Sequence, residues 1–67
     1  MPTLSINGEL TQLADLPTID QLVEQLGYEV VRIAVAVNGE FVARSQYSQT
    51  LTNDGDKIDI VQAIGGG

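Results

Sequence analysis

The C-terminal run Ile64-Gly65-Gly66-Gly67 is the part of the sequence best suited to chemistry. Glycine lacks a Cβ, so it adopts backbone conformations closed to other residues and approaches another surface closely. Three extended residues reach about 10 Å, at roughly 3.3–3.6 Å each. Such a tail can place its terminal carboxylate inside the cleft of another protein while the folded body stays outside. The alternative is a frayed end without function, since chain termini are commonly disordered.

The stretch before the tail favours a function for it. Lys57-Ile58-Asp59-Ile60-Val61-Gln62 alternates in polarity, and this alternation is typical of a strand with one buried face. Ile58 and Ile60 are predicted to face inward, and Asp59 and Val61 outward. The strand continues through Ala63 to the glycines. The tail is therefore predicted to leave directly from a folded sheet.

Two hairpins are predicted from Asn-Gly pairs, which suit the tightest hairpin turns. In the first, residues 3–7 alternate in polarity, Asn7-Gly8 forms the turn and residues 9–14 return with Leu13 inward. In the second, Asn38-Gly39 forms the turn before a return strand at 40–43. The strand before that turn carries β-branched residues at every odd position, predicted to face inward: Val31, Ile33, Val35 and Val37.

A helix is predicted between the hairpins, after the break at Asp15-Leu16-Pro17. Thr18 is a good N-cap, and Gln21 completes a capping box three residues later. Gly27 stands where a helix commonly ends. The apolar stripe consists of Ile19, Leu22, Val23 and Leu26. Beyond the second hairpin, residues 44–50 are expected to form a loop with one helical turn, and Leu51 a short edge strand.

The order of the elements predicts a single α+β domain over residues 1–64, followed by the tail at 65–67. A mixed sheet with one main helix buries both apolar surfaces in two layers and leaves the other sheet face open. On that open face we expect a small apolar docking patch of Ala34, Ala36 and Val61, with Ile64 at the root of the tail. The alternative is ordinary surface apolarity, which is common.

Composition narrows the function classes. The 67 residues include three Lys or Arg against nine Asp or Glu, giving a net charge of −6. Because nucleic-acid binding depends on cationic side chains, we expect no nucleic-acid partner, and a basic protein surface instead. The chain has no His and no Cys, which argues against an enzyme or a Cys-based metal site. Asp54, Asp56 and Asp59 lack the spacing of an EF-hand loop and indicate a turn.

Targeting signals are not visible in the sequence. No apolar run approaches the roughly 20 residues of a membrane span. No basic stretch followed by an apolar one marks a secretion signal. We therefore expect a cytoplasmic protein without a membrane partner, monomeric when free.

The whole chain resembles the ThiS family of sulfur carriers in thiamine biosynthesis, which have the ubiquitin-like β-grasp fold. The resemblance lies in the stretch from Asp54 to Gly67, in Val35-Ala36-Val37-Asn38-Gly39, and in Arg44 followed by Tyr47. The tail departs from many relatives in having three glycines rather than two.

The resemblance implies a protein co-substrate rather than an enzyme. A ThiF-type adenylyltransferase would adenylate the Gly67 carboxylate with ATP, and Gly65 and Gly66 would be the spacer. Sulfur mobilised by a cysteine desulfurase would replace AMP to give a C-terminal thiocarboxylate, which thiazole synthase, ThiG, would use. The carrier itself would bind no cofactor. The alternatives are a MoaD-like carrier of molybdopterin synthesis and a non-covalent β-grasp binding module.

Overall fold

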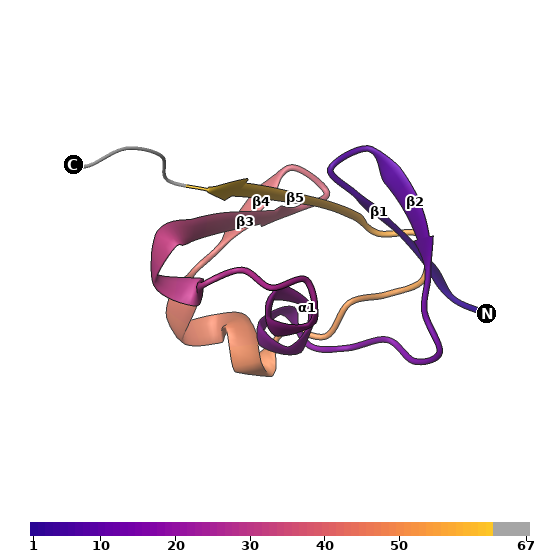
Figure 1. Cartoon of the computed structure of the whole chain (residues 1–67), viewed down its shortest axis with the longest axis horizontal. Helices are drawn as coiled ribbons and strands as arrows, with labels where there is room; N and C mark the ends of the chain where they lie inside the picture. Colours follow the sequence, from indigo (N-terminus) through magenta and orange to yellow (C-terminus); the bar gives the residue numbers. More distant parts are fainter. Residues whose placement is uncertain (63–67) are drawn as a thin grey trace.

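A five-stranded sheet of order β2-β1-β5-β3-β4 forms the framework of residues 1–62, the part of the chain that the structure, a computed structural model, describes. Helix α1 and the 3₁₀-helix η2 lie against one face of the sheet (Figure 1). This arrangement confirms the predicted α+β class with one main helix on one face. The elements in chain order are β1 (Thr3–Ile6), β2 (Glu9–Gln12), α1 (Ile19–Gln25), η1 (Val30–Arg32), β3 (Ile33–Val37), β4 (Glu40–Val42), η2 (Arg44–Gln49) and β5 (Lys57–Gln62).

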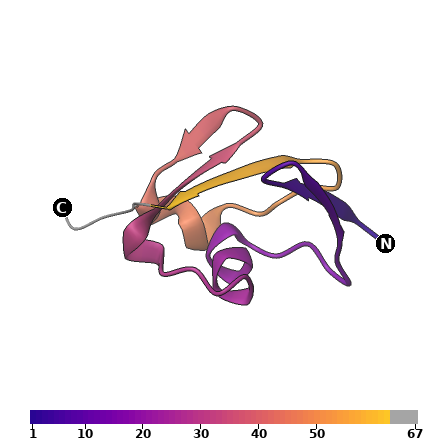
Figure 2. The same ribbon diagram turned by 45° about the horizontal axis from the view of Figure 1, so that its top comes forward.

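The sheet is mixed because β5 enters between the two hairpins (Figure 2). It pairs with β1 in parallel and with β3 antiparallel. Each hairpin is itself antiparallel. The last strand of the chain therefore lies in the centre of the sheet, where it joins the two halves.

Both predicted hairpin turns are confirmed. Asn7 and Asn38 have φ of 51° and 52°, and Gly8 and Gly39 follow with φ of 86° and 88°. Positive φ at both central residues is the requirement of a type I′ turn, which Asn-Gly meets at little steric cost. The first hairpin also confirms Leu13 as the inward residue, since it is half-buried against the core while Leu10 is exposed.

The helix forms as predicted but is shorter than its apolar stripe. The Thr18 N–H donates to Gln21 Oε1 at 3.1 Å, which is one half of the expected capping box. Gly27 has a φ of 85°, the left-handed conformation typical of a helix C-terminus. Leu26 is the C-cap and is 42% exposed, so its predicted place in the buried stripe is wrong.

The prediction that Val31 faces inward from a strand is wrong. Residues 30–32 form the 3₁₀-helix η1, and Val31 is 67% exposed. The turn is held because the Arg32 N–H donates to the Glu29 carbonyl at 3.0 Å. An Arg44 guanidinium nitrogen also donates to the Val31 carbonyl at 3.3 Å. The strand therefore begins at Ile33.

The segment after β4 is more ordered than the sequence indicated. Residues 44–49 form the 3₁₀-helix η2, whose Tyr47 is buried in the core. Leu51 makes an isolated bridge to Thr18 instead of a strand, and its side chain is exposed. The core between sheet and helices consists of Leu4, Ile6, Ile19, Leu22, Val23, Ile33, Val35, Tyr47, Ile58 and Ile60.

Candidate functional site

The root of the tail is fixed by the pairing of β5 with β3. This pairing runs from Val37 opposite Ile58 to Ile33 opposite Gln62, the last residue that the structure describes. The sheet thus holds the backbone up to the point where the tail begins. The predicted roles of Ile64, Gly65, Gly66 and Gly67 fall on residues outside the described part of the chain and stay predictions.

On its other edge β5 extends past its neighbour. The register with β1 covers Ser5 opposite Lys57 and Ile6 opposite Ile58, after which β1 turns away into its hairpin. Figure 1 shows β5 continuing well beyond that point, toward the end of the sheet opposite the N-terminus. The final residues of β5 are therefore paired with a strand on the β3 side alone.

The outward-facing residues of the central strands form one small surface. Ala34 lies opposite Val61, and Ala36 lies opposite Asp59. Since successive side chains alternate across a sheet, these residues face away from the buried Ile58 and Ile60. Val61 is 59% exposed and Ala34 is half-buried. The structure thus brings together three of the four residues predicted for the docking patch.

Phe41 belongs to the same surface, and sequence reasoning missed it. It lies opposite Ala36 in the hairpin and is 75% exposed. Ala36, between Phe41 and Asp59, is only 8% exposed although it lies outside the core cluster. The sequence did contain a signal for this position. A two-residue turn at Asn38-Gly39 fixes the register of the hairpin, and that register places Phe41 opposite Ala36. We call Ala34, Ala36, Phe41 and Val61 the open-face patch.

Ion pairing is sparse within residues 1–62. The single ion pair within residues 1–62 joins Arg32 Nε and Glu29 Oε2 at 3.2 Å, and both side chains are largely exposed. An exposed pair of this kind contributes little to stability. Within the same residues, no group of three His, Cys, Asp or Glu side chains converges to hold a metal ion. Asp54 instead accepts a hydrogen bond from the backbone N–H of Thr3 in β1, and Asp56 accepts one from the backbone N–H of Asn53 within the turn.

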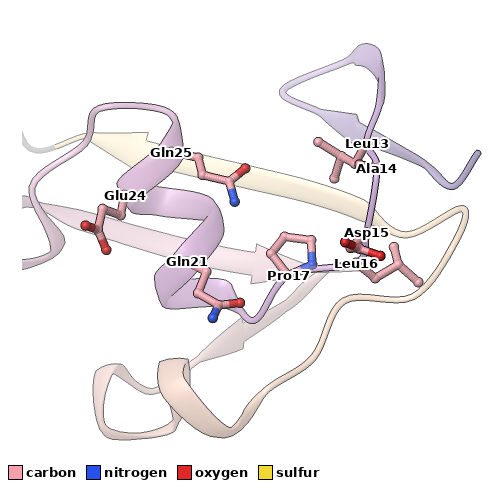
Figure 3. Close-up of a pocket in the computed structure, with 8 residues that line it drawn as sticks. All are labelled: Leu13, Ala14, Asp15, Leu16, Pro17, Gln21, Glu24 and Gln25. Carbon is pink, nitrogen blue, oxygen red and sulfur yellow. The ribbon is translucent and has the colours of Figure 1, made fainter.

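A groove lies on the helix side of the molecule, between the β2–α1 connection and α1 (Figure 3). Its volume is about 650 Å³, and its walls are lined by Leu13, Ala14, Asp15, Leu16, Pro17, Gln21, Glu24 and Gln25. Asp15 and Glu24 are its two charged residues, and its remaining polar groups are side-chain amides and backbone. The groove has no nucleophile–base pair, so we assign no chemistry to it.

No helix in the described part of the chain is long and apolar enough to cross a membrane.

Comparison with solved structures places the fold. The crystal structure of a thiamine biosynthesis protein (ThiS) from Geobacter metallireducens matches with a TM-score of 0.83 and 26% identity, over 97% of this chain and 99% of that one. The solution structure of the protein from the same organism matches with a TM-score of 0.82. These likenesses confirm the predicted ubiquitin-like β-grasp.

Comparison with curated sequences finds relatives of different length. The sulfur carrier protein ThiS of Escherichia coli is 38% identical over 91% of this chain and 92% of its own length. A thiazole synthase of Paramagnetospirillum magneticum is 44% identical over 96% of this chain, which spans 20% of that protein. The family model described as ThiS matches residues 4–67. This chain therefore belongs to the ThiS family.

Proposed function

We propose that this chain is a sulfur carrier of thiamine biosynthesis. The terminal carboxylate of Gly67 is converted to a thiocarboxylate, whose sulfur is then used to form the thiazole ring. The observation that carries the proposal is that the ThiS family match extends from residue 4 to residue 67 and so includes the glycine tail. The pairing of β5 with β3 up to Gln62 supports it, because the body can then present the tail from a fixed point.

Activation of the terminus requires a partner enzyme. A carboxylate is a poor electrophile. Its attack on the α-phosphate of ATP releases pyrophosphate and gives an acyl adenylate, whose AMP is a good leaving group. The mixed anhydride is open to hydrolysis, so the activating enzyme must enclose it and exclude water. A side chain on Gly65 or Gly66 would obstruct the narrow entrance that such enclosure needs. We propose a ThiF-type adenylyltransferase for this step.

The folded body must supply the binding energy for that encounter. Fixing a backbone residue costs about 1–2 kcal/mol, so ordering three glycines opposes binding by roughly 3–6 kcal/mol. The glycines have no side chains to offset this cost. The open-face patch is the proposed docking surface, because exposed Phe41 and Val61 flank two small alanines that allow close approach.

Sulfur enters and leaves through other proteins. A cysteine desulfurase is the proposed source: its persulfide sulfur displaces AMP from the acyl adenylate, and a thiol reductant then cleaves the resulting S–S bond to leave the thiocarboxylate. A thiazole synthase is the proposed acceptor. The Paramagnetospirillum magneticum thiazole synthase supports the acceptor, because one fifth of that protein is similar to this chain. This likeness favours the thiamine pathway over molybdopterin synthesis. The cytoplasm, which supplies the ATP for activation, is the proposed compartment.

We propose a role as substrate rather than as enzyme. The chain has neither His nor Cys, and the groove on its helix side offers no nucleophile with a neighbouring base. The carrier would hold no cofactor, since the activating enzyme binds the ATP. The working group is a single carbonyl carbon at the terminus.

The test is a mass measurement on the intact protein. The carrier is incubated with its activating enzyme, ATP and a sulfur source, and the expected product is heavier by the exchange of one oxygen for sulfur. A variant lacking Gly65, Gly66 and Gly67 is the control and should keep its mass. If the tail is incidental, as in a non-covalent binding module, the wild-type protein also keeps its mass, and removal of the tail leaves the affinity for the partner unchanged.

A further inference from the structure

One carboxylate stands within the open face. Asp59, Ala36 and Phe41 lie directly opposite one another on β5, β3 and β4, so they form one row across three strands. Val61 lies two residues further along β5 and therefore faces the same side. Asp59 is half-buried, whereas its neighbours Phe41 and Val61 are 75% and 59% exposed. The charge is thus partly covered, with apolar Ala36 beside it across the sheet and apolar Val61 beside it along β5.

Asp59 has no protein partner among residues 1–62. The ion pair found there joins Arg32 and Glu29. The side-chain hydrogen bonds of the same residues supply no donor to the Asp59 carboxylate. Lys57, two residues earlier on the same face, is exposed and does not come within ion-pair distance. Within the described residues 1–62, this carboxylate is therefore left to solvent.

Docking of a partner on the open face would change the hydration of the Asp59 carboxylate. A protein surface that covers Phe41 and Val61 reaches Asp59 as well, because Asp59 lies in the same row as Phe41 and two residues before Val61 on β5. Such a surface removes water from the carboxylate. A carboxylate that loses water without gaining a partner is strongly destabilised. A partner that supplies a cation turns this cost into selectivity, because a neutral or acidic surface is then rejected.

We propose that Asp59 is a specificity-determining residue of the docking face, and that it pairs with an arginine or lysine in the apolar contact surface of the activating enzyme. Arginine suits the position best, because its planar guanidinium binds a carboxylate through two hydrogen bonds and tolerates partial burial. The net charge of −6 also favours a partner with a basic surface, in agreement with a cation opposite Asp59. The inference rests on the proposed function, since it concerns the enzyme that acts on the tail.

The sign of one mutational effect tests the proposal. The activating enzyme is titrated calorimetrically with the wild-type carrier, Asp59→Asn and Glu40→Gln. Glu40 is the matched control: it also removes one negative charge, but it lies opposite Val37 and so on the helix side of the sheet. If a partner cation faces Asp59, Asp59→Asn leaves that cation unpaired and weakens binding by about tenfold or more. Glu40→Gln should stay within about twofold.

The opposite sign overturns the proposal. Without a partner cation, neutralising Asp59 removes a desolvation cost, so Asp59→Asn would bind as well as the wild type or better. Asp59→Ala carries the same expected direction and is a second variant if the asparagine protein unfolds on heating earlier than the wild type. If the wild-type carrier gains sulfur while Asp59→Asn and Asp59→Ala bind the activating enzyme as tightly as the wild type, this inference alone is defeated. A wild-type carrier that never gains sulfur defeats the proposed function instead.

Discussion

The side-chain oxygen of Asn7 accepts a hydrogen bond from the backbone N–H of Ile60 at 2.7 Å. The N–H of Asn7 also donates to the Ile58 carbonyl at 2.9 Å. Strand β1 has ended at Ile6, so a residue of the hairpin turn continues the parallel pairing with β5 by one further step. The strand that leads to the tail is thereby held on both sides as far as Ile60.

This relationship predicts a cost for removing the Asn7 amide. Asn7→Gly keeps the positive φ that the turn needs but leaves the part-buried Ile60 N–H without its acceptor. We expect the free energy of unfolding to fall by about 1–2 kcal/mol, measured by urea denaturation. Asn7→Asp keeps an acceptor oxygen, so its free energy of unfolding should fall by less than half as much. Equal stability of Asn7→Gly and the wild type would contradict the role of this bond.

Tyr47 is predicted to be essential for the fold. It is 3% exposed and belongs to the core cluster, although it comes from a largely polar segment. Tyr47→Ala should lower the free energy of unfolding by about 3–5 kcal/mol, as for other large aromatic truncations. Ser48→Ala is the control, because Ser48 is exposed in the same 3₁₀-helix and should change stability by less than about 0.5 kcal/mol. A small effect at Tyr47, measured by thermal unfolding, would show that η2 does not anchor the core.

Truncation of Phe41 is predicted to lower the affinity for the activating enzyme without lowering the stability of the fold. Its exposed side chain contributes little to the free protein, so Phe41→Ala should change the free energy of unfolding by less than about 0.5 kcal/mol. Affinity for the activating enzyme should fall by about tenfold, the loss expected for an aromatic contact within an interface.

Leu10→Ala is the matched control for Phe41. Leu10 is 81% exposed and lies opposite Ser5, so it is on the open face but on the far edge strand of the sheet. Its truncation should leave the affinity unchanged. Equal losses at both positions would mean that the partner covers the whole face rather than the open-face patch.

Gly66→Ala is predicted to block modification. The added methyl group widens the tail next to the reacting residue, and the entrance of an enclosed adenylation site would exclude it. The expected result is an unchanged intact mass after incubation with the activating enzyme, ATP and a sulfur source. Ala43→Gly, which changes an exposed residue of the body, should be modified as the wild type is. Full modification of Gly66→Ala would show that the tail does not enter a narrow channel.

The sequence by itself determined the features that depend on local chemistry. The Asn-Gly pairs set both hairpin turns, because the positive φ of each turn is a property of two adjacent residues. Thr18 and Gln21 marked the helix start for the same reason. The alternation along β5 placed Ile58 and Ile60 inside and Val61 outside without reference to any neighbour. The family resemblance pointed to the tail, which only modification assays can test.

Tertiary structure decided what depends on segments far apart in the chain. Val31 lies in a 3₁₀-turn closed by the Arg32–Glu29 backbone bond, and Arg44, thirteen residues away, also bonds its carbonyl. A β-branched pattern carries no record of that second contact. Tyr47 enters the core because η2 packs beside α1. Asp59 comes into line with Phe41 because β3 pairs with both β5 and β4. Burial and alignment of this kind arise from the summed packing of the whole sheet, so no single stretch of sequence specifies them.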